Sequence, residues 1–163
     1  EVVQVEYNEN TAFFKFGTTL IVGRMIDGRF PDYTNVIPDS SPKRVIVNKK
    51  ELLNKLKISD IFSNKSTHLG RFNFSGNVLE ISSEDMDFAN RAQQYLSALY
   101  EGEDLEIGFN VALMTDIVDN VPTEDVILEL DSPNRSAVML PSTQEENEDL
   151  LMLLMPIMLG VTY

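Results

Sequence analysis

The chain has 163 residues, 43% of them hydrophobic, which suffices for one well-buried domain with an appendage. It holds no cysteine, which excludes a disulfide framework and thiolate chemistry, and its longest apolar run, residues 150–161, is too short to span a bilayer. A net charge of −13 argues against general attraction to nucleic acid.

The first 42 residues read as the end of a domain followed by a linker. Residues 2–7 and 11–16 alternate apolar and polar side chains, and residues 18–25 predict a third strand. Three antiparallel strands cannot bury a core alone, so we expect residues 1–42 to hold the last strands of a larger domain and the chain to be a piece of a longer protein. Three prolines in residues 30–42 mark the linker.

One pattern occurs twice from Lys43 onward. Residues 44–48 and 106–110 each predict a strand that ends in an asparagine, and asparagine is a good helix N-cap. Glu51 stands three residues after Asn48, the spacing of a capping box. Apolar residues then form one face of each predicted helix: Leu52, Leu53 and Leu56 in the first, and Val111, Met114, Ile117 and Val118 in the second.

Strand-like runs follow both predicted helices. They cover residues 68–74, 78–83 and 92–99 after the first, and residues 125–130, 137–140 and 150–155 after the second. The chain therefore predicts an α+β domain over residues 43–159. It is a pseudo-symmetric repeat of β-α-β-β-β with two helices packed on antiparallel sheets, followed by a tail at residues 160–163.

No catalytic constellation is predicted, and neither is a cofactor or a metal. The single histidine, His68, lies in a predicted strand, where histidine is most often structural. The carboxylates Glu84, Asp85 and Asp87 could hold a divalent metal, although such clusters in a loop are usually solvated turns. The acidic run of residues 145–149 reads as a soluble segment before the apolar tail.

The first predicted helix is the candidate for contact with nucleic acid. Residues 43–71 hold eight of the 13 basic residues and only two acids. Lys50 and Lys57 flank the apolar face of the helix, with Lys49 and Lys55 further round. Lysine suits non-specific phosphate contacts, and no aromatic side chains interleave to stack on bases. An ordinary basic surface helix is the alternative reading.

Two proline-containing segments lie near opposite ends of the chain, Asp-Gly-Arg-Phe-Pro-Asp-Tyr at residues 27–33 and Leu-Leu-Met-Pro-Ile-Met-Leu at residues 153–159. With Gly-Phe-Asn at residues 108–110 between them, they resemble the bacterial DNA sliding clamps, the β subunits of the replicative polymerase. The resemblance covers about residues 18–159. In that family the first segment joins the second and third domains, and the second closes the chain.

The resemblance implies a groove that binds short linear peptides of the polymerase, the clamp loader and repair proteins. Its residues by position would be Pro31, Val36, Asn110, Leu113, Leu153, Met155, Pro156 and Ile157. We expect the chain after Met155 to leave the sheet, with Ile157, Met158 and Leu159 exposed, because proline cannot donate to the ladder. Asn35 and Met158 stand where other clamps often carry arginine, and Leu113 stands where they often carry tyrosine. The resemblance therefore predicts the apolar part of the groove but not its polar part.

The resemblance also implies that Lys49, Lys50, Lys55 and Lys57 face duplex DNA and that Ile61 and Phe62, after the basic helix, pack across the joint of a homodimeric ring. A buried helix end is the plain alternative for that pair. The expected function is then a non-catalytic processivity factor, cytoplasmic and nucleoid-associated, with no membrane contact. The alternatives are a small acidic metal-dependent hydrolase that uses Glu84, Asp85 or Asp87, and an adaptor domain that binds protein through its tail and never meets DNA.

Overall fold

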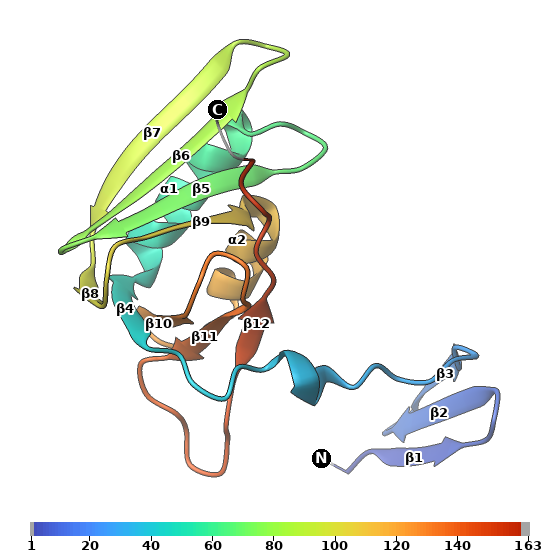
Figure 1. The fold of residues 1–163 in the computed structure, drawn as a ribbon. Helices are drawn as coiled ribbons and strands as arrows, with labels where there is room; N and C mark the ends of the chain where they lie inside the picture. The colour runs from blue at the N-terminus through green and yellow to red at the C-terminus, as the bar shows by residue number, and fades with distance from the viewer. Residues whose placement is uncertain (1, 161–163) are drawn as a thin grey trace. The chain divides into compact units, whose positions relative to one another are not determined.

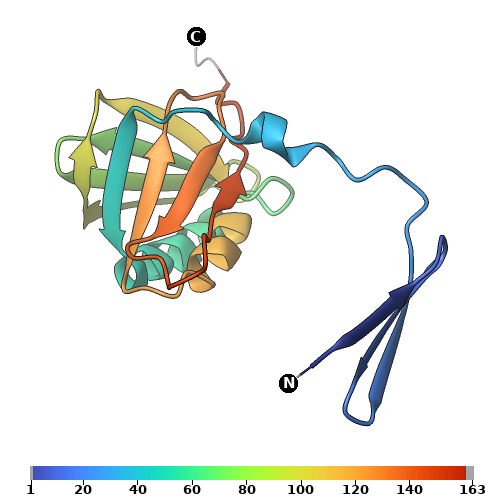
Figure 2. The same cartoon turned by 90° about the horizontal axis from the view of Figure 1, so that it is seen from below.

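The computed structural model of the protein describes residues 2–160 and divides into two compact units between Tyr33 and Thr34 (Figures 1 and 2). The first unit is a three-stranded antiparallel sheet of β1 (Gln4–Tyr7), β2 (Thr11–Phe16) and β3 (Thr19–Arg24). These are the three strands that the alternation predicts. Within this unit the apolar face that carries Phe14 and Ile21 stays largely exposed, as expected for strands that cannot bury a core alone.

The second unit begins with a single 3₁₀ turn, η1 (Tyr33–Val36), that reaches back by one residue into the first unit. The elements of its first half are β4 (Lys43–Asn48), α1 (Lys49–Phe62), β5 (Leu69–Ser75), β6 (Val78–Asp85), β7 (Asn90–Ser97) and β8 (Leu99–Glu101). Those of its second half are β9 (Leu105–Asn110), α2 (Val111–Asp119), β10 (Asp125–Leu130), β11 (Ala137–Pro141) and β12 (Met152–Leu154). The predicted β-α-β-β-β repeat is therefore confirmed, with β8 as an addition to the first copy.

The two halves exchange their first strands. One sheet has the order β12-β11-β10-β4-β8, so β4 of the first half pairs with β10 of the second. The other has the order β7-β6-β5-β9, so β9 of the second half pairs with β5 of the first. Because each half completes the sheet of the other, neither can bury its apolar face alone. Figure 2 shows both helices side by side against the sheets.

Equivalent asparagines start the two helices. Asn48 Oδ1 accepts from the backbone N–H of Glu51 at 3.2 Å, and Asn110 Oδ1 accepts from that of Leu113 at 2.9 Å. Both predicted N-caps are confirmed. Each asparagine also lies opposite the first residue of the strand with which it pairs, Asp125 of β10 for Asn48 and Leu69 of β5 for Asn110.

One hydrophobic core joins the sheets and the helices. Its largest fully buried side chains come from both halves and include Phe72, Phe74, Leu52, Leu56, Phe109 and Met114. Phe72 and Phe109 meet edge to face with ring centroids 5.4 Å apart, across the pairing of β5 with β9. This aromatic contact joins the two halves within the sheet that they share. Across residues 2–160, no helix is both long and apolar enough to cross a membrane.

Several predicted boundaries are wrong. Ile61 and Phe62 are the last residues of α1 rather than residues after it. Glu84 and Asp85 end β6 and do not lie in a loop. The predicted strand at residues 150–155 shrinks to β12, because the acidic loop before it extends to Leu151 and the ladder stops before Met155. Residues 161–163 of the predicted tail lie outside the described residues.

Candidate functional site

A hollow of about 340 Å³ lies where the start of the second unit meets β11 and the end of β12. Ser136 Oγ donates to the carbonyl oxygen of Val36 at 2.7 Å and so ties the segment before β4 to the sheet. Val36 and Met155, both half-exposed, supply apolar wall. The lining residues are Asn35, Val36, Ile37, Pro38, Asp39, Asn134, Arg135, Ser136 and Met155. The lining is thus mixed, with four apolar residues among five polar or charged ones, and it offers a ligand both apolar contact and hydrogen-bonding groups.

The C-terminal segment passes this hollow and then docks on the other sheet. Leu154 pairs with Ala137 of β11, Met155 leaves the ladder, and the backbone N–H of Ile157 donates to the carbonyl of Gly108 at 2.8 Å. The expectation that residues 157–159 all leave the sheet with exposed side chains is wrong. Ile157 and Leu159 are half-buried against β9, and only Met158 is largely exposed, at 68%.

The structure brings together only part of the predicted groove. Val36 and Met155 line the same hollow, and Leu153, Pro156 and Ile157 lie next to Met155 along the chain. Asn110 and Leu113 start α2, where Asn110 is occupied as the helix cap and also donates from Nδ2 to the carbonyl of Thr67 at 3.2 Å, while Leu113 is 53% exposed. Pro31 belongs to the first unit, whereas the other predicted groove residues belong to the second.

Several residues of the hollow are not predictable from the sequence. Asn134, Arg135 and Ser136 come from the turn between β10 and β11, and no motif in the sequence marks that turn as part of a site. Arg135 is held by an ion pair from its Nε to Asp131 Oδ2 at 3.3 Å. Gly108 stands out in the sequence as part of the Gly-Phe-Asn motif, and an isolated glycine in a strand pattern also indicates close approach of another backbone.

The four lysines of α1 do not share one environment. Lys50 and Lys57 are exposed and lie with Asn54 and Ile61 on one stripe of the helix, while Lys55 is half-buried. Lys49 is engaged within the fold, because its Nζ donates to the carbonyls of Asp119 at 2.9 Å and Val121 at 2.6 Å, at the C-terminal end of α2. Of the four lysines, Lys50 and Lys57 are therefore the two that are exposed to solvent.

The last turn of α1 continues the same stripe into an apolar surface. Ile61 is 65% exposed and Ile58 is 42% exposed, whereas Phe62 is half-buried. Two side chains from the loop after α1 hold this turn through Asp60. His68 Nδ1 lies 2.6 Å from Asp60 Oδ1, and Lys65 Nζ donates to the carbonyl of Asp60 at 2.8 Å. His68 is thus a structural residue at a positive φ of 50°, and Ile61 is the exposed member of the predicted pair.

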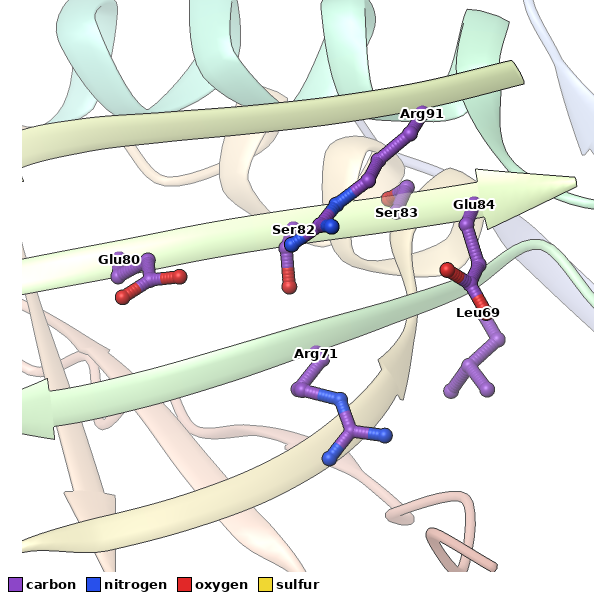
Figure 3. A pocket seen from close by; sticks show the side chains of 7 residues that line it. All are labelled: Leu69, Arg71, Glu80, Ser82, Ser83, Glu84 and Arg91. Carbon is purple, nitrogen blue, oxygen red and sulfur yellow. The ribbon is translucent and has the colours of Figure 1, made fainter. Parts of the chain in front are cut away.

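A second hollow, also of about 340 Å³, lies on the four-stranded sheet (Figure 3). Two of its charged residues have partners within the protein: Arg71 forms an ion pair with Glu106, and Glu80 accepts from Gln93 Nε2 at 2.7 Å. Asp85 is buried and its Oδ1 accepts from the backbone N–H of Asp87 at 3.0 Å, which closes the turn after β6. Within residues 2–160, no group of three or more His, Asp or Glu side chains is arranged to hold a metal. The hydrolase reading has no support in this geometry.

Comparison with known proteins identifies the family. A sequence model described as "DNA polymerase III beta subunit, C-terminal domain" matches residues 34–158, which is most of the chain. The chain belongs to the DNA polymerase III beta subunit family. Among curated relatives, the beta sliding clamp of Pseudomonas putida is 31% identical over 136 residues, and that of Proteus mirabilis is 30% identical over 127 residues.

Solved structures of the family agree. The DNA polymerase sliding clamp of Pseudomonas aeruginosa, solved with a ligand, aligns with a TM-score of 0.87 at 27% identity and covers 96% of this chain. A sliding clamp from Bartonella birtlesii bound to griselimycin also gives 0.87, at 26% identity over 96% of this chain. The fold is therefore the sliding-clamp fold. The chain spans 37% of the length of the Pseudomonas putida relative and 42% of the Pseudomonas aeruginosa clamp.

Proposed function

We propose that this chain is the C-terminal part of a sliding clamp, a processivity factor without catalytic activity that encircles duplex DNA and tethers the replicative polymerase. The observation that carries the proposal is the match to the family's C-terminal domain over residues 34–158, together with the hollow at Val36 and Met155. A tether needs no reaction chemistry, since it raises the local concentration of an enzyme on its template.

The peptide groove is the main partner site in this proposal. It is supported by the apolar surface of Val36 and Met155 beside the polar groups of Asn134, Arg135 and Ser136. One clamp relative is described as bound to griselimycin, which supports the presence of a ligand site in this fold. The polymerase, the clamp loader and repair proteins would present extended apolar motifs to this surface in turn.

The DNA contact in this proposal is a weak one through α1. Exposed Lys50 and Lys57 would attract phosphates without reading sequence, while Asp116 and Asp119 on α2 keep that attraction small. Exposed Ile61 and its half-buried neighbour Phe62 would meet a neighbouring subunit in a homodimeric ring. A cytoplasmic location at the nucleoid follows from this role and belongs to the same proposal.

Binding of a labelled peptide of the Gln-Leu-x-Leu-Phe type, measured by fluorescence anisotropy, tests the proposal. Met155→Lys places a charge in the hollow and should weaken binding about tenfold or more. Met86→Lys is the matched control, because Met86 is 85% exposed in the turn between β6 and β7. Equal affinity of the two variants would overturn the groove. An adaptor domain that does not meet DNA would bind this peptide too. Lys50→Glu with Lys57→Glu separates the two readings, because it should weaken DNA association only in a clamp.

A further inference from the structure

Gly108 is buried in β9 between Arg71 of β5 on one side and Ile157 of the C-terminal segment on the other. A Cβ atom added at Gly108 would lie 2.5 Å from the backbone oxygen of Ile157 and 2.8 Å from Leu159 Cδ2. Neither approach is sterically possible without movement, and the nearer atom belongs to the backbone. Glycine is therefore required here so that the C-terminal segment can cross β9 in close contact.

The pseudo-symmetry of the fold explains what the segment does there. In the first half, Ile46, two residues before the cap Asn48, pairs with Leu99 of β8, and β8 makes three such pairs with β4. In the second half, Gly108, two residues before the cap Asn110, pairs with Ile157 in an isolated bridge. Residue 157 is thus the counterpart of Leu99, and the C-terminal segment is the counterpart of β8, held by one bridge in place of three pairs.

This bridge fixes the wall of the hollow. Met155 and Pro156 are the only residues between two anchors, the pairing of Leu154 with Ala137 and the bridge of Ile157 with Gly108. So short a span has little freedom while both ends are held. Met155 lines the hollow together with Val36, so one wall of the hollow is joined to an anchor on the other sheet.

We propose that Gly108 is a positioning residue for the peptide groove: it seats residues 157–159 on β9 and thereby presets Met155 for the partner peptide. The inference rests on the proposed function, because the groove itself is part of that proposal. Gly108 would not touch the peptide. It would act by removing the cost of ordering the wall on binding, the usual gain from a preorganised site.

The test combines amide hydrogen exchange with peptide binding in the whole chain. Gly108→Ala should speed exchange of the Ile157 amide, which donates to Gly108, and should weaken binding of a Gln-Leu-x-Leu-Phe peptide about tenfold. Gly23→Ala is the matched control, because a Cβ there meets nothing within 4 Å. Leu159→Ala removes one contact with Gly108 and leaves the sequence of β9 unaltered, so we expect a smaller loss of peptide affinity than in Gly108→Ala. The exchange rates of the Ile107 and Phe109 amides report whether β9 is intact in each variant.

The possible outcomes separate this inference from the proposed function. Unchanged Ile157 exchange in Gly108→Ala would overturn it, and so would faster exchange with unchanged peptide affinity. If the unsubstituted chain failed to bind the peptide at all, the proposed function and the groove part of the inference would both be overturned. Exchange at Ile157 would still decide whether Gly108 anchors the C-terminal segment.

Discussion

Lys49, the first residue of α1, donates from its ammonium to the carbonyl of Val121 at 2.6 Å and so bridges the start of one helix to the end of the other. A second bond reaches the carbonyl of Asp119, the last residue of α2, at 2.9 Å. Carbonyls at a helix C-terminus lack intrahelical partners and carry partial negative charge, which favours a cation there. Lys49 therefore has a structural role that Lys50, its exposed neighbour, does not share.

Lys49→Met should lower the free energy of unfolding by about 1–2 kcal/mol, since it keeps an apolar stem but removes the charged donor from two carbonyls. Lys50→Met should change it by less than about 0.5 kcal/mol, as an exposed substitution away from such contacts does. Urea denaturation of both variants measures the difference. Equal midpoints would show that the bridge between the helices does not contribute to stability.

Asn48→Ala and Asn110→Ala should each cost about 1 kcal/mol, because each removes the acceptor for a free N–H in the first turn of a helix. Asn110 also donates to Thr67 at 3.2 Å, while the matching bond from Asn48 to Glu124 is longer, at 3.4 Å, so Asn110→Ala should cost more. Thermal unfolding gives the ranking. A larger loss for Asn48→Ala would contradict this comparison.

The double variant Lys50→Glu with Lys57→Glu should weaken association with a short duplex at low salt and lower the slope of log affinity against log salt by about 2. Lys15→Glu with Arg24→Glu makes the same change in charge on the first unit and serves as the control. Fluorescence anisotropy at several salt concentrations measures both. If the two double variants behaved alike, the net charge rather than α1 would govern DNA association.

Tyr100 should make stability fall at high pH. Burial, with the carboxylates of Asp104 and Glu103 nearby, raises the pKa of its phenol above the ordinary value of 10.0. The folded state thus keeps a proton that the unfolded chain loses, so the stabilising contribution is complete below pH 10 and is lost as the pH rises through the folded pKa. Unfolding midpoints between pH 9 and pH 11.5 measure the loss.

Tyr100→Phe is the variant that isolates this effect. It should be less stable at neutral pH, since the phenol donates to the carbonyl of Glu103, and it should lose part of the alkaline decline. Tyr95→Phe, at an exposed position, is the control and should keep the decline. An unchanged pH profile in Tyr100→Phe would assign the decline to other groups.

The sequence predicted local features well, because they depend on neighbouring residues. The caps Asn48 and Asn110 and the strand at residues 125–130 follow from short-range chemistry and from alternation of apolar side chains. The order β-α-β-β-β, found twice, also predicted the fold class. The exchange of β4 and β9 between sheets was not predicted, since pairing across distant segments leaves no local pattern.

Part of the hollow is predictable from the sequence, through resemblance to a family rather than through local patterns. Val36 and Met155 were assigned from the resemblance to a family, and the structure brings both to one hollow. The contacts that hold this hollow, from Ser136 to Val36 and from Ile157 to Gly108, join residues far apart in the chain, so composition and spacing could not reveal them. The resemblance implies a DNA-facing role for Lys49 as for its neighbours, whereas in the fold its ammonium donates to the carbonyls of Asp119 and Val121.

An NMR titration with a peptide of the Gln-Leu-x-Leu-Phe type tests most directly whether this chain carries the partner-binding groove of a clamp. We expect saturable shifts at Val36, at residues 134–136 and along residues 153–159, with the lysines of α1 unaffected. Saturable shifts elsewhere, or no shifts in the folded chain at millimolar peptide, would contradict this expectation.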